Sequence, residues 1–411
     1  MNRASKNLAN LVAISLGLLT SSVGNAQEWL DTIDDHLFLQ SRDGFFRTDL
    51  SVMHDAEWQF VDLRPPGLIF RDDDLWNSRL YMFLDTKIGQ HLYSLVQARF
   101  DRGFDPRSDH FEGRADEYLL RYMPFHDGRL NVQFGKFATV VGDWVPRHLS
   151  WDNPFINAPL PYENVTIITD QAAPPSPAAF LARRTSPDKK FIWVPMIWGP
   201  SYSTGGSVFG RVAKFDYAVE VKATSISSRP SAWDARHIGF DDPTVSGRVG
   251  FRPNSSWNLG ASFSRGPYLL PAAEPTLPGG SDIGDFNQIT IGHDISYARR
   301  HWQVWAEFFW SRFEVPNVGN ADTWAYYIET KYKLTTRLFI AARWNQQFFG
   351  EVPNGAGGES RWDRDISRAE LAFGYRFNRH WQGKVQYSYS HQNGPFQQGE
   401  QLVALQLTTK F

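Results

Sequence analysis

The chain has 411 residues, and its 42 lysines and arginines against 44 aspartates and glutamates leave a net charge of −2 at pH 7. This balance lacks the basic excess that nucleic-acid binding requires, and the absence of cysteine excludes disulfides, thiolate metal sites and cysteine nucleophiles. Mean hydropathy is −0.41, and no stretch after the first thirty residues is apolar enough for a membrane helix.

Residues 1–26 have the pattern of a secretory signal peptide. Arg3 and Lys6 precede a short apolar core, and small residues around Gly24 favour a cut before Gln27. Removing this segment would leave a net charge of about −4, because it carries two basic residues and no acidic one. We expect residues 27–44 to be a periplasmic lead-in, and the pattern assigns them no function.

From residue 45 onward, apolar and polar residues alternate with the period of two that is typical of β-strands. In the segment 76–88, for example, Trp76, Leu80 and Leu84 share one face while Arg79 and Asp85 share the other. The alternation predicts sixteen strands, near residues 46–61, 76–88, 91–103, 114–124, 129–140, 206–214, 216–225, 243–253, 256–266, 286–298, 301–314, 322–334, 337–348, 364–377, 380–391 and 400–411.

Short turns alternate with long loops along this series. Four turns carry an aromatic or leucine residue on each side, namely Phe251 to Trp257, Tyr297 to Trp302, Leu334 to Leu338 and Phe377 to Trp381. The stretches between them are longer and rich in Gly, Pro, Ser and Asp. Short turns on one side and long loops on the other are typical of an antiparallel up-and-down β-barrel with periplasmic turns and extracellular loops.

The polar strand faces are too charged to form the dry core of a soluble barrel, because each unpaired buried charge would cost several kcal/mol. A water-filled lumen removes that cost, and sixteen strands enclose one. Aromatic residues make up 15% of the chain, as expected for a barrel with aromatic girdles at both membrane interfaces. The candidates for a pore lining are Arg79, Arg99, Arg121, Arg211, Arg248, Glu307, Glu329, Arg343, Arg368 and Glu370.

Residues 141–205 break the strand rhythm. Ten of the 24 prolines lie between Pro146 and Pro200, and proline is excluded from central strands. We interpret this stretch as one long loop that either folds inward, as a constriction or plug, or covers the barrel mouth. Its candidate constriction residues are Arg147, His148, Asp152, Arg183 and Arg184. If Phe180–Thr185 and Phe191–Trp198 formed a hairpin instead, the barrel would have eighteen strands.

The segment 400–411 alternates like a strand and ends on Phe411. Such a closing strand, in a chain that begins with an export signal, resembles those of Gram-negative outer-membrane β-barrels. In that family it is also the signal read by the barrel-assembly machinery. The implied surroundings are outer-membrane lipid and lipopolysaccharide.

With this strand plan the chain resembles the porin superfamily. The run Val132-Gln133-Phe134-Gly135-Lys136-Phe137, followed by a long loop, is similar to a segment of the phosphate-selective porins. A phosphate-selective member would have a basic constriction, whereas the lumen charges here are balanced, so no binding residue is carried over. The wider family implies passive diffusion of small solutes, often through a homotrimer.

Three functions therefore remain open. The first is a channel for passive diffusion of small hydrophilic or ionic solutes. The second is a plugged barrel that acts as an adhesin or envelope scaffold, and an outer-membrane hydrolase is the third. The sequence shows no zinc-spaced histidine pair and no glycine-rich phosphate loop, so we expect no metal, cofactor or catalytic residue.

Overall fold

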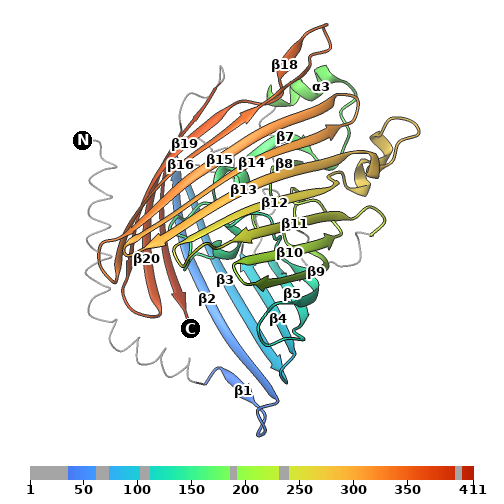
Figure 1. The fold of residues 1–411 in the computed structure, drawn as a ribbon. Helices are drawn as coiled ribbons and strands as arrows, with labels where there is room; N and C mark the ends of the chain where they lie inside the picture. The colour runs from blue at the N-terminus through green and yellow to red at the C-terminus, as the bar shows by residue number, and fades with distance from the viewer. Residues whose placement is uncertain (1–35, 62–73, 102–111, 186–191, 231–239, 394–399) are drawn as a thin grey trace, which may run out of the picture.

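The computed structural model describes residues 36–61, 74–101, 112–185, 192–230, 240–393 and 400–411. The predicted signal segment 1–26 lies outside these residues. Within them, sixteen long strands form one antiparallel sheet that wraps into a barrel (Figure 1). The strands are β2 (Phe46–Val61), β3 (Asp74–Ile88), β4 (Leu92–Asp101), β5 (Glu112–Tyr122), β6 (Asn131–Phe137), β9 (Ser203–Val212), β10 (Phe215–Lys222), β11 (Thr244–Phe251), β12 (Trp257–Pro267), β13 (Asn287–Arg299), β14 (Trp302–Val315), β15 (Gly319–Lys333), β16 (Leu338–Phe349), β19 (Ile366–Arg376), β20 (Trp381–Gln392) and β21 (Glu400–Lys410).

The barrel is closed by the first and last long strands. β2 pairs with β21 in a register that runs from Met53 opposite Lys410 to Val61 opposite Leu402. At the end of the chain, the Val52 N–H donates to the Phe411 carbonyl at 2.7 Å, and the Phe411 N–H donates to the Val52 carbonyl at 3.0 Å. Closure removes the free edges that an open sheet would expose.

The predicted strand plan is confirmed, including the four short turns, each of which joins two consecutive barrel strands. The eighteen-strand alternative is wrong. Residues 177–182 form the helix α3, because Ser176 caps its first turn by accepting from the Ala179 N–H at 3.2 Å and a proline occupies the first helical position. The strand β8 (Trp193–Pro195) pairs with β7 (Val165–Thr169), outside the barrel sheet.

Three short elements remain among the described strands. β1 (Phe38–Gln40), which falls in the predicted lead-in, adds to the start of β2. β17 (Glu351–Pro353) and β18 (Glu359–Arg361) form a hairpin that projects beyond the barrel rim between β16 and β19. Among the described helices, none is long and apolar enough to cross a bilayer.

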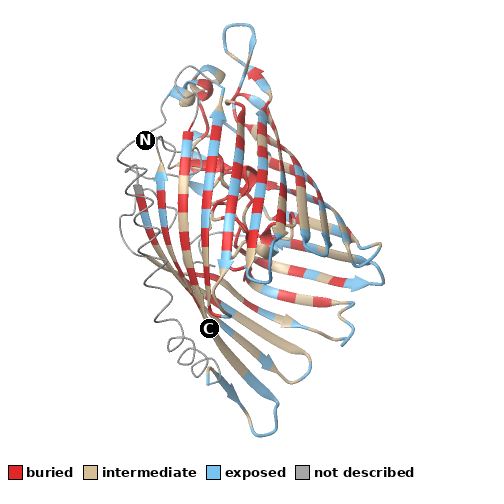
Figure 2. Ribbon diagram, turned by 90° about the vertical axis from the view of Figure 1, so that its left-hand side faces the viewer, coloured by how far each residue is buried: buried red, intermediate tan, exposed pale blue. Residues whose placement is uncertain are grey.

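The barrel is inverted relative to a soluble protein. On β19, Leu371 is 62% exposed on the outer surface while Glu370 beside it is only 2% exposed. Figure 2 shows this alternation as red and pale-blue bands along many of the strands. A surface that exposes leucine and buries glutamate is stable only where the surroundings are apolar. The barrel therefore spans a lipid bilayer, and barrels of this construction are proteins of the Gram-negative outer membrane.

A β-bulge changes which side chains of β5 face inward. The register between β4 and β5 shifts at Gln97 and Ala98, so that one extra residue of β5 is accommodated. As a result Asp116 turns into the barrel, where it is 1% exposed. The buried Lys136 of β6 stabilises the bulge, because its Nζ donates to the Ala115 carbonyl at 2.6 Å. Bulges commonly re-aim side chains next to functional sites.

Candidate functional site

The long loop lies inside the barrel. β6 and β9 are neighbouring strands, with Phe137 opposite Ser203, so residues 138–202 leave the wall and return to it at adjacent points. We call this segment the inner loop. It contains α2 (Leu160–Glu163), β7, α3 and β8. Its side chains and backbone contact inward-facing residues of β14, β15, β16, β19 and β20, as the following contacts show.

Three polar contacts link the inner loop to the far wall. The Arg147 guanidinium lies 2.5 Å from the Glu329 carboxylate of β15. The Tyr162 hydroxyl donates to Glu307 of β14 at 2.8 Å. Both carboxylates are almost fully buried, with Glu329 at 0% and Glu307 at 2% exposure. Charge-assisted hydrogen bonds of this kind are roughly twice as strong as neutral ones. The third is the 2.7 Å pair between Arg368 of β19 and Glu163.

Two buried cations also hold the loop backbone. Arg343 of β16 is fully buried, pairs with Glu370 at 2.5 Å and donates to the Asn157 carbonyl at 2.8 Å. Lys384 of β20 donates to the carbonyls of Ser150, Asn153 and Phe155 at 2.7, 3.0 and 3.2 Å. The loop is therefore fixed to the β14–β20 side of the barrel by groups that would be costly to bury alone.

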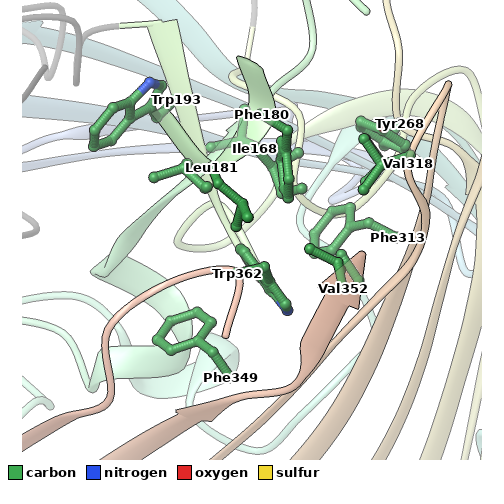
Figure 3. Packing of buried hydrophobic residues seen from close by; sticks show 14 of the residues in the cluster. Ile168, Phe180, Leu181, Trp193, Tyr268, Phe313, Val318, Phe349, Val352 and Trp362 are labelled. Atoms are coloured by element: carbon green, nitrogen blue, oxygen red, sulfur yellow. The ribbon is translucent and has the colours of Figure 1, made fainter. Parts of the chain in front are cut away.

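An apolar cluster fixes the extracellular part of the inner loop. Phe180 and Leu181 of α3 pack with Trp362, which lies in the connection from β18 to β19 (Figure 3). Phe349 meets the Trp362 ring edge-on at 4.7 Å between ring centres. We call this group the extracellular cluster. Its burial of several aromatic side chains stabilises this end of the inner loop, since a fully buried side chain of this size contributes about 1.5–3 kcal/mol.

The docked loop leaves a cavity beside the first four barrel strands. The cavity has a volume of about 320 Å³ and lies between the loop and the inner faces of β2, β3, β4 and β5. Its charged lining residues are four basic and four acidic, namely Arg79, Arg99, Arg114 and Arg229, and Glu57, Glu112, Asp116 and Glu163. The cavity therefore has no net formal charge.

One wall of the cavity is a chain of ion pairs. Arg79 of β3 lies 3.2 Å from Glu57 of β2 and 3.2 Å from Asp101 of β4. Arg99 lies 2.8 Å from Asp101. Asp116 lies 3.5 Å from Arg99 and 3.0 Å from Arg114 of β5, which the bulge turns inward beside it. We call this group the ion-pair wall.

The loop side of the cavity is mainly aromatic. Trp144 and Tyr162 pack with their ring centres 4.7 Å apart, and both line the cavity. The Tyr202 hydroxyl lies 2.8 Å from His148 Nε2, while His148 Nδ1 lies 2.6 Å from the Val145 carbonyl. Since a carbonyl only accepts, Nδ1 donates and Nε2 accepts from Tyr202. Burial lowers the pKa of His148 to about 4, which matches this neutral form.

Five apolar side chains pack together on the periplasmic side of the cavity. Met53 of β2, with Tyr81 and Phe83 of β3, packs against Leu149 and Trp151 of the inner loop. Below this level, inner-face residues of β2 become exposed: the Arg47 and Asp49 side chains are 47% and 41% exposed. We call these five packed side chains the apolar floor.

Solved structures of similar architecture identify the fold. No protein-family profile and no curated protein matches the chain. An anion-selective porin from Comamonas acidovorans superposes with a TM-score of 0.55 at 10% identity, covering 89% of this chain and 100% of its own. This chain has the porin fold.

Two other solved structures agree with this assignment. The outer membrane channel DcaP of Acinetobacter baumannii gives a TM-score of 0.56 at 10% identity, with 91% of this chain and 99% of that chain covered. The outer membrane protein OmpT of Vibrio cholerae, in a trimer form, gives 0.54 at 11% identity, with 89% and 99% covered. At such low identity these likenesses concern the porin fold alone.

The predicted pore-lining residues fall into distinct groups within this porin fold. Arg79 and Arg99 border the cavity, and Arg121 of β5 donates to Gln133 at 3.0 Å. Arg248 of β11 pairs with Asp294 at 2.6 Å, whereas Arg211 is exposed at the end of β9. The remaining five lie on the side where the inner loop docks: Glu307, Glu329, Arg343, Arg368 and Glu370.

The predicted constriction residues also separate. Arg147 and His148 lie inside the barrel, as described above. Asp152 is exposed. Arg183 and Arg184 lie at the extracellular end, where Arg183 donates to the Ile167 carbonyl at 3.2 Å and Arg184 to the Arg361 carbonyl at 2.7 Å. These two arginines hold loop segments together away from the cavity.

The sequence alternation missed Arg114 and Asp116. A regular β5 that points Glu117 and Arg121 inward would point both of these residues at the lipid. Charges at the lipid face of a barrel cost about 2–4 kcal/mol near the bilayer centre. The cost of placing two charged residues against lipid is the feature of the sequence from which a bulge in β5 could have been predicted. The aromatic side chains of Trp144, Tyr162 and Tyr202 were also missed, because a loop has no periodicity from which their direction could be predicted.

Proposed function

We propose that this protein is a channel of narrow bore in the outer membrane, which admits small hydrophilic or ionic solutes by passive diffusion. The observation that supports it best is that the inner loop does not fill the barrel. Its two shortest ion pairs with the wall lie on β15 and β19, while the side formed by β2–β5 keeps a cavity of about 320 Å³. A loop that served only as a plug would gain most by filling both sides.

The charge pattern supports selection by size and hydrogen bonding rather than by the sign of charge. Rings of one sign give ion selectivity in barrels. Here four basic and four acidic side chains line the cavity, and the ion-pair wall holds most of them in mutual contact. We expect weak discrimination between potassium and chloride.

Passage requires a displacement at the apolar floor. Leu149 and Trp151 belong to the inner loop, while Met53, Tyr81 and Phe83 belong to the rigid wall. The loop side is therefore the part that moves. One anchor of this segment is Lys384, which holds the carbonyls of Ser150 and Asn153. We infer that the channel alternates between a closed floor and an open one.

The plugged scaffold is the second candidate, and the same floor favours it. Buried ion pairs on one side, the extracellular cluster above and the apolar floor below together resemble a permanent seal.

We propose no enzymatic activity. The carboxylates of Glu57, Asp101 and Asp116 are engaged by arginines in the ion-pair wall, which leaves them poorly suited to act as bases.

Single-channel recording in planar bilayers tests the channel against the scaffold. We expect small ohmic steps from the wild type and a reversal potential near zero in a potassium chloride gradient. Trp151→Ala, which removes the largest side chain of the floor, should raise the conductance at least twofold. Trp76→Ala, on the lipid side of β3 and 44% exposed, is the matched control. If neither the wild type nor Trp151→Ala conducts a current, the plugged-scaffold function replaces the channel function.

We also propose that the barrel assembles as a homotrimer, which the trimer form of the similarly folded OmpT supports. Mass measurement of the protein in mild detergent should give three chains per particle. A single chain per particle would refute this arrangement.

A further inference from the structure

We propose that the cavity is a binding site for a neutral, polyhydroxylated solute of about monosaccharide size. This inference rests on the proposed channel function, since it names the solute class that the channel would select. It is carried by the chemistry of the two facing walls and by two unpartnered polar atoms, one in a residue of the inner loop and one in a residue of β2.

The ion-pair wall disfavours a charged solute. Asp101 lies within 3.7 Å of Arg79, Arg99 and Arg114, so an anion would have to compete with a carboxylate that is already in place. A cation would meet the same arginines. Paired guanidinium and carboxylate groups still offer hydrogen bonds to a third group, because each has more donors or lone pairs than one partner uses. Such a wall suits hydroxyl groups, which both donate and accept.

The aromatic wall suits the other face of such a solute. The hydroxyl of Tyr162 is directed to Glu307 and that of Tyr202 to His148. Because both hydroxyls already have partners, these tyrosines can contact a solute only through their ring surfaces. The ring of Trp144 adds a third such surface. Ring surfaces pack against the C–H groups of a sugar ring, whose hydroxyls then point to the opposite wall. A compact ion has no comparable apolar face.

Two residues that line the cavity each have a buried polar atom without a hydrogen-bond partner. Trp144 is 4% exposed and Gln59 is 5% exposed, and both line the cavity. Among the described residues, neither Trp144 Nε1 nor Gln59 Oε1 has a hydrogen-bond partner. One is a donor and the other an acceptor. A hydroxylated solute satisfies both, whereas an anion satisfies only the indole and a cation only the amide oxygen.

The size of the cavity agrees with a small solute. Its volume of about 320 Å³ is at the lower end of the range of roughly 300–1,000 Å³ that is usual for small-molecule sites. A single sugar ring fits with its ordered water. Longer oligosaccharides would extend past Arg229 toward the extracellular side, where a second cavity of about 200 Å³ shares that residue.

The test uses the complete barrel and four probes of similar size: glucose, phenylalanine, benzoate and lysine. Titration calorimetry of the detergent-solubilised protein measures binding, and planar-bilayer recording measures block of the ionic current. We expect glucose to bind and to reduce the current, and the three charged or zwitterionic probes to bind at least tenfold more weakly. Tighter binding of benzoate, lysine or phenylalanine than of glucose would overturn the inference.

Two conservative variants test the two buried atoms. Trp144→Phe keeps a ring but removes the N–H, and Gln59→Met keeps the length but removes the amide oxygen. Each should weaken glucose binding about tenfold, the effect of one lost hydrogen bond to a buried group. The matched controls are Trp76→Phe on the lipid face and Gln90→Met in an exposed turn, which should leave binding unchanged. Equal glucose affinity in the wild type and both cavity variants would refute the site.

The two proposals fail separately. If the wild type binds glucose but carries no current, the site exists and the channel function is wrong. If it carries current that glucose does not alter, and calorimetry detects no glucose binding, the channel stands and the sugar site is wrong.

Discussion

Arg368 on the barrel wall and Glu163 on the inner loop form an ion pair of 2.7 Å, although 205 residues separate them in the chain. The same guanidinium lies 3.4 Å from Glu370, and Glu163 also lines the cavity. Because this pair holds a residue that lines the cavity, the position of the inner loop affects the shape of the cavity.

Replacing Arg368 by glutamine should loosen the inner loop. The change leaves Glu163 and Glu370 close together with one fewer cation, and removing one partner of a buried pair costs about 3–5 kcal/mol. We expect a noisier and larger single-channel current. Arg47→Gln breaks an exposed pair with Asp49 and should have no such effect. An unchanged current in Arg368→Gln would mean that this pair does not set the loop position.

Gly142→Ala should displace the loop near Glu307. Gly142 has a positive φ of +86°, and an added Cβ would lie 2.0 Å from the Tyr162 hydroxyl and 2.7 Å from Glu307 Oε1. Both the backbone conformation and the space therefore require glycine. We expect faster cleavage of the inner loop by added protease in folded barrels. Gly279→Ala, which has open space around it, is the control, and equal cleavage rates would contradict the prediction.

Lys384→Met should release the segment around the apolar floor. The substitution keeps the side-chain length but leaves the carbonyls of Ser150, Asn153 and Phe155 without their shared donor. Each buried carbonyl left without a partner costs about 1–3 kcal/mol. Faster hydrogen exchange in residues 148–156 should follow. Lys333→Met, at an exposed turn, should leave that exchange rate unchanged.

Acid should weaken docking of the inner loop through His148. Its pKa is lowered to about 4 by burial, below the ordinary value of about 6.5. The docked state is therefore fully favoured above pH 6.5, and this contribution is lost as the pH falls from 6.5 toward 4. The loss is at most about 1.4 kcal/mol for each pH unit. We expect proteolysis of the loop to accelerate between pH 7 and pH 5.

The control for this prediction must separate His148 from other groups. Burial raises the pKa of Asp363 in the connection from β18 to β19 to about 6, so this carboxyl favours the folded state on acidification and opposes the effect of His148. The difference between wild type and His148→Gln isolates the histidine. His301→Gln, at an exposed turn, should behave like the wild type. A pH dependence that persists in His148→Gln would assign it elsewhere.

Leu371→Arg should destabilise the barrel in lipid. Leu371 is 62% exposed on the outer surface of β19, and an arginine facing lipid costs about 2–4 kcal/mol near the bilayer centre. Urea titration of barrels refolded into vesicles measures the loss. Leu334→Arg lies in a short turn at the water interface and should cost less than about 1 kcal/mol. Equal losses would mean that Leu371 does not face the bilayer interior.

The sequence alone determined the barrel, because strand alternation is a local property. The period of two places Leu371 and Glu370 on opposite faces whatever lies across from them, and the predicted export signal favoured an apolar face that meets lipid. Turn composition then fixed the strand boundaries within a few residues, as at Phe377 and Trp381. The proline-rich segment was likewise recognisable as a single long loop from its local composition.

Only the tertiary structure shows which residues of the barrel wall contact that loop. Glu307, Glu329, Arg343 and Arg368 have the alternation of pore-lining residues, yet each contacts the inner loop. Glu370 pairs with Arg343 and Arg368. The pairing of Arg368 with Glu163 depends on the path of a loop without periodicity, and no local rule encodes it. The bulge that turns Arg114 and Asp116 inward shifts the alternation by one residue, and its place depends on the register with β4. The cavity lies where the inner loop leaves space beside β2–β5, and its position depends on these long-range contacts.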